Sequence, residues 1–212
     1  MPLYKTYSFK SNYLVGIWKI SEPLEFFTKS IIISESEKQY FEKTSLLSRK
    51  LQWLACRLLV KELLRGPFNI IYNENGKPFL EDNQYNISFT HTKEFAGVII
   101  SKNMEVGIDI EKIALRMEKV SSKFLSEKES IENKESASIE KLSVYWCAKE
   151  ALFKIKGKHS ISLQENLIIC PFELEQQGKI EGIIYDEQKI NKYILYYEKI
   201  EEHMLVFTHK HI

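Results

Sequence analysis

The chain has 212 residues, of which 44% are hydrophobic and 28% charged; this composition supports a folded core and excludes a disordered or fibrous chain. Thirty basic side chains against 29 acidic ones leave a formal charge of +1, so the molecule has no overall attraction to nucleic acid or to an anionic membrane. The length fits one large domain or two lobes of roughly a hundred residues each.

The first third of the chain is predicted to contain a strand, a short helix and one long helix. These elements are expected at residues 15–20, 21–31 and 34–64. Leucines recur at helical intervals in the long helix, and Ser34 is suited to be its N-cap. The Gly-Pro pair at 66–67 is expected to end the helix.

Short apolar segments separated by turn residues follow, and they predict strands. These are expected at residues 70–72, 85–89, 95–101 and 105–111. The sequence Asn73-Glu-Asn-Gly76 is typical of the tight turn after the first of them.

The second half of the chain is predicted to repeat the order of helices followed by strands. A polar stretch at 114–137 contains the capping-box pattern Ser126 to Glu129, and a strong helix is expected from Ser138 to Lys156, ending at Gly157. The rest is predicted to be strands with turns between them. Strands are expected at 167–174, 180–186, 192–200 and 203–209, with turns at 177–178 and 201–202.

The two long helices resemble one another. The segment Trp53 to Lys61 aligns without a gap on Trp146 to Lys154, and Trp, Ala, Leu and Lys coincide at the same offsets. Chance similarity between amphipathic helices is an alternative to duplication. With the similar order of elements in both halves, the match favours an α+β fold of two similar α/β lobes, residues 1–101 and 102–212.

Three cysteines, Cys56, Cys147 and Cys170, lack the C-x-x-C spacing and lie beside apolar residues. Buried free thiols are therefore expected rather than a metal or redox site. No apolar leader segment is visible, and no stretch approaches the roughly 18 apolar residues of a membrane span. A cytoplasmic protein is expected.

Two acids share one face of a predicted strand. Strand alternation places Asp109 and Glu111 together and Ile108 and Ile110 on the opposite face. Adjacent carboxylates repel unless a cation lies between them, and hard oxygen ligands suit Mg²⁺. The alternative is an exposed edge strand with two solvated acids.

Glu150 and Lys154 lie one helical turn apart and share a face of the second long helix. They could form a simple surface ion pair. The surrounding residues are strongly apolar, however, so a buried acid and base would require partners, and a metal–phosphate complex would satisfy both.

Two loops carry residues suited to phosphate. Gly76 allows close approach to the backbone, and Lys77 offers a positive charge between Asn75 and Pro78. His91 follows a strand directly and has Thr90 before it. A hairpin turn and a structural histidine are the alternatives for these loops.

The order and spacing of these motifs resemble a known family. Val106-Gly-Ile-Asp-Ile-Glu111, followed about forty residues later by Trp146-Cys-Ala-Lys-Glu-Ala-Leu-Phe-Lys154, is similar to the paired signature of the 4′-phosphopantetheinyl transferase superfamily. Gly76-Lys-Pro78 and Asn86-Ile-Ser-Phe-Thr-His91 resemble its coenzyme A loops. The resemblance covers residues 46–157, and the length resembles the pseudo-dimeric, surfactin-synthetase-activating type, which implies two lobes around a pseudo-twofold axis.

The resemblance implies transfer of 4′-phosphopantetheine from coenzyme A to a serine of an apo acyl or peptidyl carrier protein, with Mg²⁺ as cofactor and release of 3′,5′-ADP. By motif, the magnesium ligands are Asp109, Glu111 and Glu150. Glu150 is the candidate general base, and Lys154 is expected to hold the pyrophosphate. The remaining coenzyme A contacts are expected from Asn75, Gly76, Lys77, Pro78, Thr90 and His91, with Arg49 and Arg57 near the 3′-phosphate.

One active site is expected in a monomer, because Arg57 stands in the first helix at the offset of Glu150. The segment Phe124 to Glu129 resembles the family's carrier-recognition element. Basic groups that could steer an acidic carrier helix are Lys112, Arg116, Lys119 and Lys123; a solvated charged helix is the alternative.

Two other functions are compatible with the sequence. One is a coenzyme A- or nucleotide-binding module without transferase activity, which would tolerate the loss of a metal ligand. The other is a Mg²⁺-dependent phosphohydrolase that uses the same acids on water, although no separate water-activating group is evident in the sequence.

Overall fold

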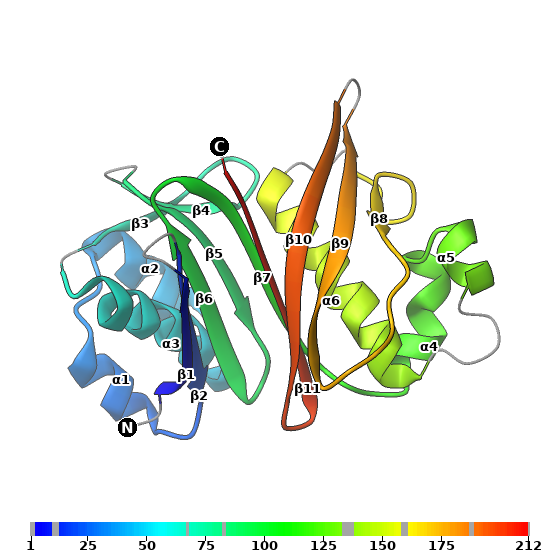
Figure 1. Ribbon diagram of the computed structural model, residues 1–212. Coiled ribbons are helices and arrows are strands. Elements are labelled where there is room, and N and C mark those ends of the chain that lie inside the picture. The colour runs from blue at the N-terminus through cyan, green and yellow to red at the C-terminus, as the bar shows by residue number, and fades with distance from the viewer. Residues whose placement is uncertain are drawn as a thin grey trace.

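The structure is a computed structural model with two antiparallel sheets side by side and helices on their outer sides (Figure 1). It describes residues 3–9, 13–66, 68–81, 84–132, 138–157, 161–186 and 189–211. The expected α+β architecture is confirmed. No helix in these ranges is both long enough and apolar enough to cross a bilayer.

The first sheet has six strands in the order β1-β2-β6-β5-β4-β3. Its strands are β1 (Leu3–Phe9), β2 (Tyr13–Lys19), β3 (Ile70–Tyr72), β4 (Pro78–Leu80), β5 (Asn86–His91) and β6 (Phe95–Ser101). Three helices belong to this half: α1 (Leu24–Ser30), α2 (Glu35–Lys43) and α3 (Leu47–Leu64). Apolar residues of α3, such as Leu54 and Leu58, share a buried cluster with Val98 of β6.

The second sheet has five strands in the order β7-β11-β10-β9-β8. They are β7 (Met104–Lys112), β8 (Leu167–Ile169), β9 (Gln177–Asp186), β10 (Lys189–Ile200) and β11 (His203–His211). The helices of this half are α4 (Arg116–Val120), the 3-10 turn η1 (Ser121–Lys123), α5 (Glu127–Glu132) and α6 (Ile139–Lys156). Leu152 of α6 packs with Leu195 and Val206 of this sheet.

The two halves share one strand order once β1 is set aside. In each sheet, the strand that comes first in the chain pairs with the one that comes last, and the others follow in reverse chain order. The orders are β2-β6-β5-β4-β3 and β7-β11-β10-β9-β8. Helices α3 and α6 both have 18 residues, and both end at a left-handed residue, Arg65 with φ 54° and Gly157 with φ 60°. This agreement supports two similar lobes; a pseudo-twofold relation between them stays a prediction.

A third buried cluster holds the two sheets together. Val15, Ile17 and Ile99 of the first sheet pack with Ile108 and Leu205 of the second. Apolar burial of this size stabilises by roughly 1.5–3 kcal/mol per fully buried side chain. The two sheets are thereby fixed against one another, and so are the side chains at their junction.

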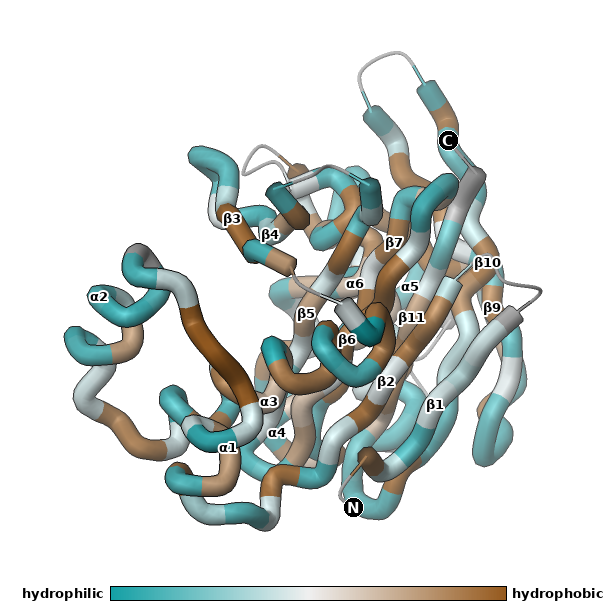
Figure 2. The backbone as a smooth tube through the Cα atoms, turned by 90° about the vertical axis from the view of Figure 1, so that its left-hand side faces the viewer, coloured by the Kyte–Doolittle hydropathy of each residue, from teal (hydrophilic) through white to brown (hydrophobic). Residues whose placement is uncertain are grey.

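The prediction of one long helix at 34–64 is wrong in one respect, because two helices, α2 and α3, lie there. Ser34 caps α2 with a full capping box, in which its side chain accepts from the Glu37 N–H and the Glu37 carboxylate accepts from the Ser34 N–H. The chain then leaves helical geometry at Thr44 and at Leu46, whose backbones are extended. Figure 2 shows α2 at the periphery of the molecule, largely in the teal of hydrophilic residues.

Other expectations are confirmed or corrected strand by strand. Helix α6 begins after Ser138 and ends before Gly157 as expected, whereas the strand expected at 167–174 is only β8. The prediction of a turn at 177–178 is wrong, because these residues begin β9. Gly178 lies against the Tyr197 ring, and a Cβ there would be 2.8 Å from it. Strands β1 and β4 were not expected, and Pro67 lies outside the described residues.

The segment Phe124 to Glu129 is partly buried in the second lobe and leaves Glu127 and Lys128 exposed, so its resemblance to a carrier-recognition element stays a prediction. Phe124 is 0% and Glu129 1% exposed. The Glu129 carboxylate pairs with the buried Lys149 ammonium at 2.6 Å and accepts from the Ile169 N–H at 2.8 Å. This acid is therefore a structural link between α5, α6 and β8.

None of the three cysteines forms a disulfide, as expected. Cys56 and Cys147 are buried and Cys170 is half-buried. Burial raises the pKa of the Cys56 thiol to about 12, which makes this thiol a poor nucleophile at neutral pH.

Candidate active site

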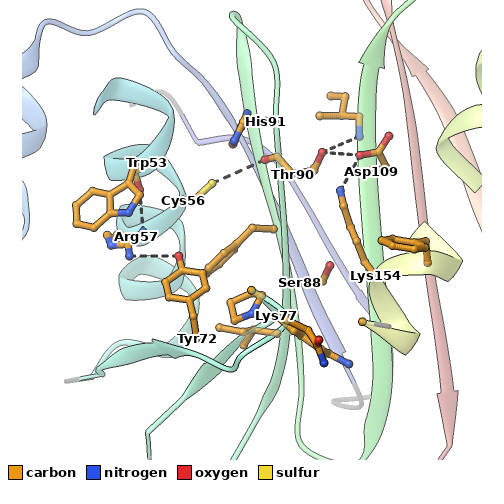
Figure 3. A pocket seen from close by; sticks show the side chains of 18 of the residues that line it. Trp53, Cys56, Arg57, Tyr72, Lys77, Ser88, Thr90, His91, Asp109 and Lys154 are labelled. Atoms are coloured by element: carbon orange, nitrogen blue, oxygen red, sulfur yellow. Dashed lines mark hydrogen bonds and ion pairs between the residues drawn. The ribbon is translucent and has the colours of Figure 1, made fainter. Parts of the chain in front are cut away.

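A pocket of about 600 Å³ opens between the two lobes (Figure 3). Helix α3, the β3–β4 turn and β5 form one wall, and β7 with the end of α6 forms the other. Except for Glu150, every site residue that the sequence predicts lines this pocket: Arg49, Arg57, Asn75, Gly76, Lys77, Pro78, Thr90, His91, Asp109, Glu111 and Lys154.

A glycine sets the distance between α6 and β7. A Cβ on Gly107 would lie 2.0 Å from the carbonyl oxygen of Ala151, so only glycine lets the helix approach the strand this closely. The approach brings the Lys154 ammonium within 2.7 Å of Asp109 Oδ1 and within 2.9 Å of the Ile108 carbonyl oxygen. The strand motif and the helix motif thus meet at one point.

Asp109 is buried, and its two carboxylate oxygens have different surroundings. Oδ1 accepts hydrogen bonds from Lys154 and, at 3.0 Å, from the Thr90 hydroxyl. Oδ2 is buried and has no hydrogen-bond partner within the described part of the chain. A buried oxygen without a partner costs about 1–3 kcal/mol. Burial, and then the negative charge of Asp109, raise the pKa of the neighbouring Cys147 thiol, so a cation would reach Oδ2 only if the side chains that cover it moved.

Glu111 lies two residues further along β7, on the same face. Burial, and then the negative charge of Asp109, raise the pKa of its carboxyl, while Arg116 acts against them through an ion pair. The Asp109 effect shows that the two acids are close enough for their charges to repel, as alternation in β7 predicted.

Glu150 is half-buried on α6 and does not line the pocket. Burial, and then the negative charge of Asp109, raise the pKa of its carboxyl to about 7, although Lys154 opposes the shift. A carboxyl that titrates near neutrality is suited to accept a proton from a hydroxyl group. It is also an acid that a neighbouring cation would keep ionised.

The residues that the family motif assigns to a metal have the right chemistry for Mg²⁺. Asp109 has a buried oxygen without a hydrogen-bond partner among the described residues, and Glu111 and Glu150 add hard carboxylate oxygens; after burial, the negative charge of Asp109 is the main cause that raises the pKa of both glutamates. In the ranges that the structure describes, no three His, Cys, Asp or Glu side chains are already gathered around a metal position. The acids therefore form an incomplete site that a cation would have to draw together.

The β3–β4 turn is held by its own side chains. Asn73 Oδ1 accepts from the Asn75 N–H at 3.0 Å and the Lys77 N–H at 2.9 Å, and Gly76 has a φ of 75°. Lys77 does not point into open space, because its ammonium donates to the Ile155 carbonyl oxygen at the end of α6, at 2.6 Å. The turn is thus joined to the opposite lobe.

At the other end of the pocket, Arg57 is stacked and paired. Its guanidinium lies 3.3 Å from the Trp53 ring centre and 2.8 Å from the Glu37 carboxylate, and it donates to the Tyr72 hydroxyl. Only 2% of Arg57 is exposed. The aromatic residues Tyr40, Trp53 and Tyr72 line this end; none was predicted as a site residue, although Trp53 stood out in the helix comparison.

His91 and Arg49 lie where the pocket meets solvent. Both have exposed side chains. Although part of the His91 side chain is exposed, burial of the rest, and then the positive charge of Arg49, lower the pKa of His91, so its imidazole is neutral at neutral pH. A neutral ring can still donate one hydrogen bond to a phosphate oxygen.

Two comparisons with known proteins agree with this geometry. A model of the 4′-phosphopantetheinyl transferase superfamily matches residues 105–208. The 4′-phosphopantetheinyl transferase gsp of Aneurinibacillus migulanus is 32% identical over 137 residues, which cover 59% of this chain and 56% of that protein. The match thus spans little more than half the length of the relative. These matches and the motifs that meet in the pocket make residues 105–208 similar to the 4′-phosphopantetheinyl transferase superfamily.

Proposed function

We propose that the chain transfers the 4′-phosphopantetheine group of coenzyme A to a serine hydroxyl of an apo acyl or peptidyl carrier protein, with release of 3′,5′-ADP. One observation carries the proposal. The acid-bearing strand and the lysine-bearing helix of the family meet at Asp109 and Lys154, 2.7 Å apart, in a pocket whose other wall bears Arg49 and His91.

Lys154 is suited to hold the pyrophosphate of coenzyme A. An ammonium group has three N–H donors, and two of them are used by Asp109 and the Ile108 carbonyl. The third is free for a phosphate oxygen, and the side chain is only partly exposed. In a pocket partly closed to water, this positive charge stabilises the negative charge that develops on the phosphoryl oxygens and the leaving group.

Glu150 is the proposed general base. It would take the proton of the carrier serine as the serine oxygen attacks the phosphorus and the bond to the 3′,5′-ADP oxygen breaks. Without a metal its pKa is raised to about 7 by burial and then by Asp109, and a bound cation would lower this pKa and hold Glu150 in the ionised form that accepts a proton. Glu150 would accept this proton directly or through one intervening water.

Mg²⁺ is the proposed cofactor, held by Asp109, Glu111 and Glu150. When bound, it would neutralise charge on the pyrophosphate oxygens. The support is the free buried oxygen of Asp109 and the mutual repulsion of the three acids.

The adenosine end of coenzyme A is proposed to lie along Asn75, Gly76, Lys77 and Pro78. Arg49 is exposed and can reach a 3′-phosphate, since its guanidinium makes only a long hydrogen bond, 3.3 Å, to the Gln52 side chain within the described part of the chain. Arg57 is a weaker 3′-phosphate ligand than the sequence predicts, because Glu37 already neutralises it.

A second groove, of about 730 Å³, continues from the pocket and is the proposed place of the carrier protein. The two share Arg49, His91 and Glu111, so a serine entering along the groove would reach the phosphates. The groove is also lined by Lys93, Lys112 and Arg116. Because Lys112 and Arg116 already pair with acids, Arg49 and Lys93 have more positive charge to offer an acidic carrier helix.

We propose a single site in a cytoplasmic monomer whose lobes are related by a pseudo-twofold axis. The shared strand order of the lobes supports the internal symmetry. Arg57, paired with Glu37, takes the place in α3 that Glu150 has in α6, which supports the loss of a second metal site. The free thiols are compatible with a reducing compartment.

The proposal is tested by measuring whether an apo carrier protein gains the mass of a phosphopantetheine group. The protein is incubated with coenzyme A, MgCl₂ and a panel of apo carrier proteins, and intact masses are measured. One carrier should gain a phosphopantetheine on its serine. Lys154→Met should abolish the gain, whereas Lys156→Met, a lysine on the same helix that pairs with Asp186 outside the pocket, should not. No mass gain on any carrier contradicts the proposal.

A coenzyme A-binding module without transferase activity is the second candidate. The observation in its favour is that the described residues hold no ready-made cluster of metal ligands. If this candidate is correct, calorimetry will show coenzyme A binding that does not respond to Mg²⁺, and no carrier will be modified.

A further inference from the structure

The Thr90 hydroxyl contacts Asp109, the acid of the opposite lobe. Its hydroxyl donates to Asp109 Oδ1 at 3.0 Å and accepts from the Ile110 N–H at 3.0 Å (Figure 3). Thr90 is 4% exposed and Asp109 6%. Thr90 is on β5 of the first sheet and Asp109 on β7 of the second, so these bonds join the two lobes at the pocket.

The hydroxyl has no donor left for a phosphate. A threonine hydroxyl carries one hydrogen, and in Thr90 that hydrogen is committed to Asp109 while the Ile110 N–H occupies an acceptor position. The sequence assigned Thr90 to the phosphates of coenzyme A. The observed contacts favour another role.

The contacts fix which oxygen of Asp109 is free. Two donors, Thr90 and Lys154, act on Oδ1, and Oδ2 is buried with no hydrogen-bond partner in the described ranges. Rotation of the carboxylate would break both bonds and move Oδ2 away from its present position. Lys154 has a long flexible side chain, whereas Thr90 is short, buried on a strand and bound to the backbone. Thr90 is therefore the more rigid of the two anchors.

We propose that Thr90 is a positioning residue that orients Asp109 so that Oδ2 is presented to a divalent cation. The inference rests on the proposed function, since it assumes that Asp109 is a metal ligand. It also explains why an uncompensated oxygen persists in a buried place: the oxygen is held ready for a ligand. Residues that hydrogen-bond a metal ligand typically change metal affinity 10–100-fold when they are removed.

The test uses Mn²⁺ as a spectroscopic substitute for Mg²⁺, with binding followed by electron paramagnetic resonance, both with and without coenzyme A. Thr90→Val removes the hydroxyl with little change of shape and should weaken Mn²⁺ binding about 10-fold or more. Thr90→Ser keeps the hydroxyl and should restore binding to within a few-fold of the parent protein. Thr90→Ala, which lacks both the hydroxyl and the methyl group, should behave like Thr90→Val and replaces it if that variant does not fold.

The matched control is Thr208→Val. Thr208 is fully buried on β11 and donates to the Ile194 carbonyl at 2.8 Å, outside the pocket. This variant loses a buried threonine hydrogen bond without touching Asp109. It should lower the denaturation midpoint but leave Mn²⁺ affinity unchanged, which separates positioning from general stability.

Three results would overturn the inference: unchanged Mn²⁺ affinity in folded Thr90→Val or Thr90→Ala, no recovery in Thr90→Ser, or no Mn²⁺ binding by the parent protein in either condition. The proposed function is tested separately by carrier mass. If Mn²⁺ binding depends on Thr90 but no carrier is modified, the transferase proposal fails and the positioning stands. If carriers are modified and the Thr90 variants bind Mn²⁺ normally, the positioning inference fails and the transferase proposal stands.

Discussion

Replacement of Glu150 by glutamine should make the metal-free protein more stable at alkaline pH. In the folded protein the pKa of this carboxyl is about 7, against an ordinary value of 4.5. The folded state therefore binds the proton more tightly than the unfolded state does. Stability conferred by Glu150 is complete below pH 4.5 and is lost as pH rises through 7.

The size of the effect follows from the shift. The difference of about 2.5 pKa units corresponds to at most about 3.4 kcal/mol, at about 1.36 kcal/mol per unit. Because Glu150 is only half-buried and lies near Lys154, about 1–3 kcal/mol is the realistic range. Glu150→Gln removes the charge and should recover this amount at pH 8 and almost none of it at pH 4.5.

The assay is urea unfolding of both proteins with a chelator at a series of pH values. Glu62→Gln, which changes an exposed acid on α3, is the control. Its stability relative to the parent protein should not rise between pH 4.5 and 8. Added Mg²⁺ should then stabilise the parent protein at pH 8 more than Glu150→Gln, because a ligand stabilises the state that binds it. A stability difference between Glu150→Gln and the parent that does not change with pH would refute the reasoning.

Three further changes test the packing. Gly107→Ala puts a methyl group 2.0 Å from the Ala151 carbonyl oxygen, so it should cost about 1–3 kcal/mol of unfolding free energy or more, measured by urea denaturation, and abolish transfer. Lys149→Met leaves the buried Glu129 carboxylate without its cation and should cost about 3–5 kcal/mol in the same assay; a loss below 1 kcal/mol would contradict this. Burial lowers the pKa of His203 from its ordinary 6.5, so stability falls as pH drops below about 6.5; thermal melting of His203→Phe should show a smaller loss between pH 7 and 5.

The sequence predicted the elements that carry the candidate site because their signals are local. Helix α6 was correctly bounded by Ser138 and Gly157, since an N-cap serine and a C-terminal glycine act within one turn of the helix. Alternation along β7 correctly put Asp109 and Glu111 together, and both line the pocket. The candidate residues come together because the two motifs meet across Gly107.

What the sequence did not reveal depends on contacts between distant segments. The 18-residue helix α3 begins only at Leu47, after a break that apolar periodicity does not signal. The segment Phe124 to Glu129 resembles a carrier-recognition element, and the sequence does not show that Phe124 and Glu129 are buried or that Glu129 pairs with Lys149 in the core. Thr90 looks like a phosphate ligand beside His91, but the packing of β5 against β7 turns its hydroxyl to Asp109. No local pattern distinguishes these outcomes.

The most direct measurement is the initial rate of phosphopantetheine transfer to an apo carrier by Asp109→Asn, with coenzyme A saturating and its binding confirmed by calorimetry. Asparagine keeps the size of the side chain and an oxygen for Thr90, but it removes the negative charge that Lys154 and a cation require. We predict a rate at least a hundredfold below that of the parent protein, with coenzyme A still bound. Transfer at the parental rate would contradict the assignment of this pocket as the transferase site.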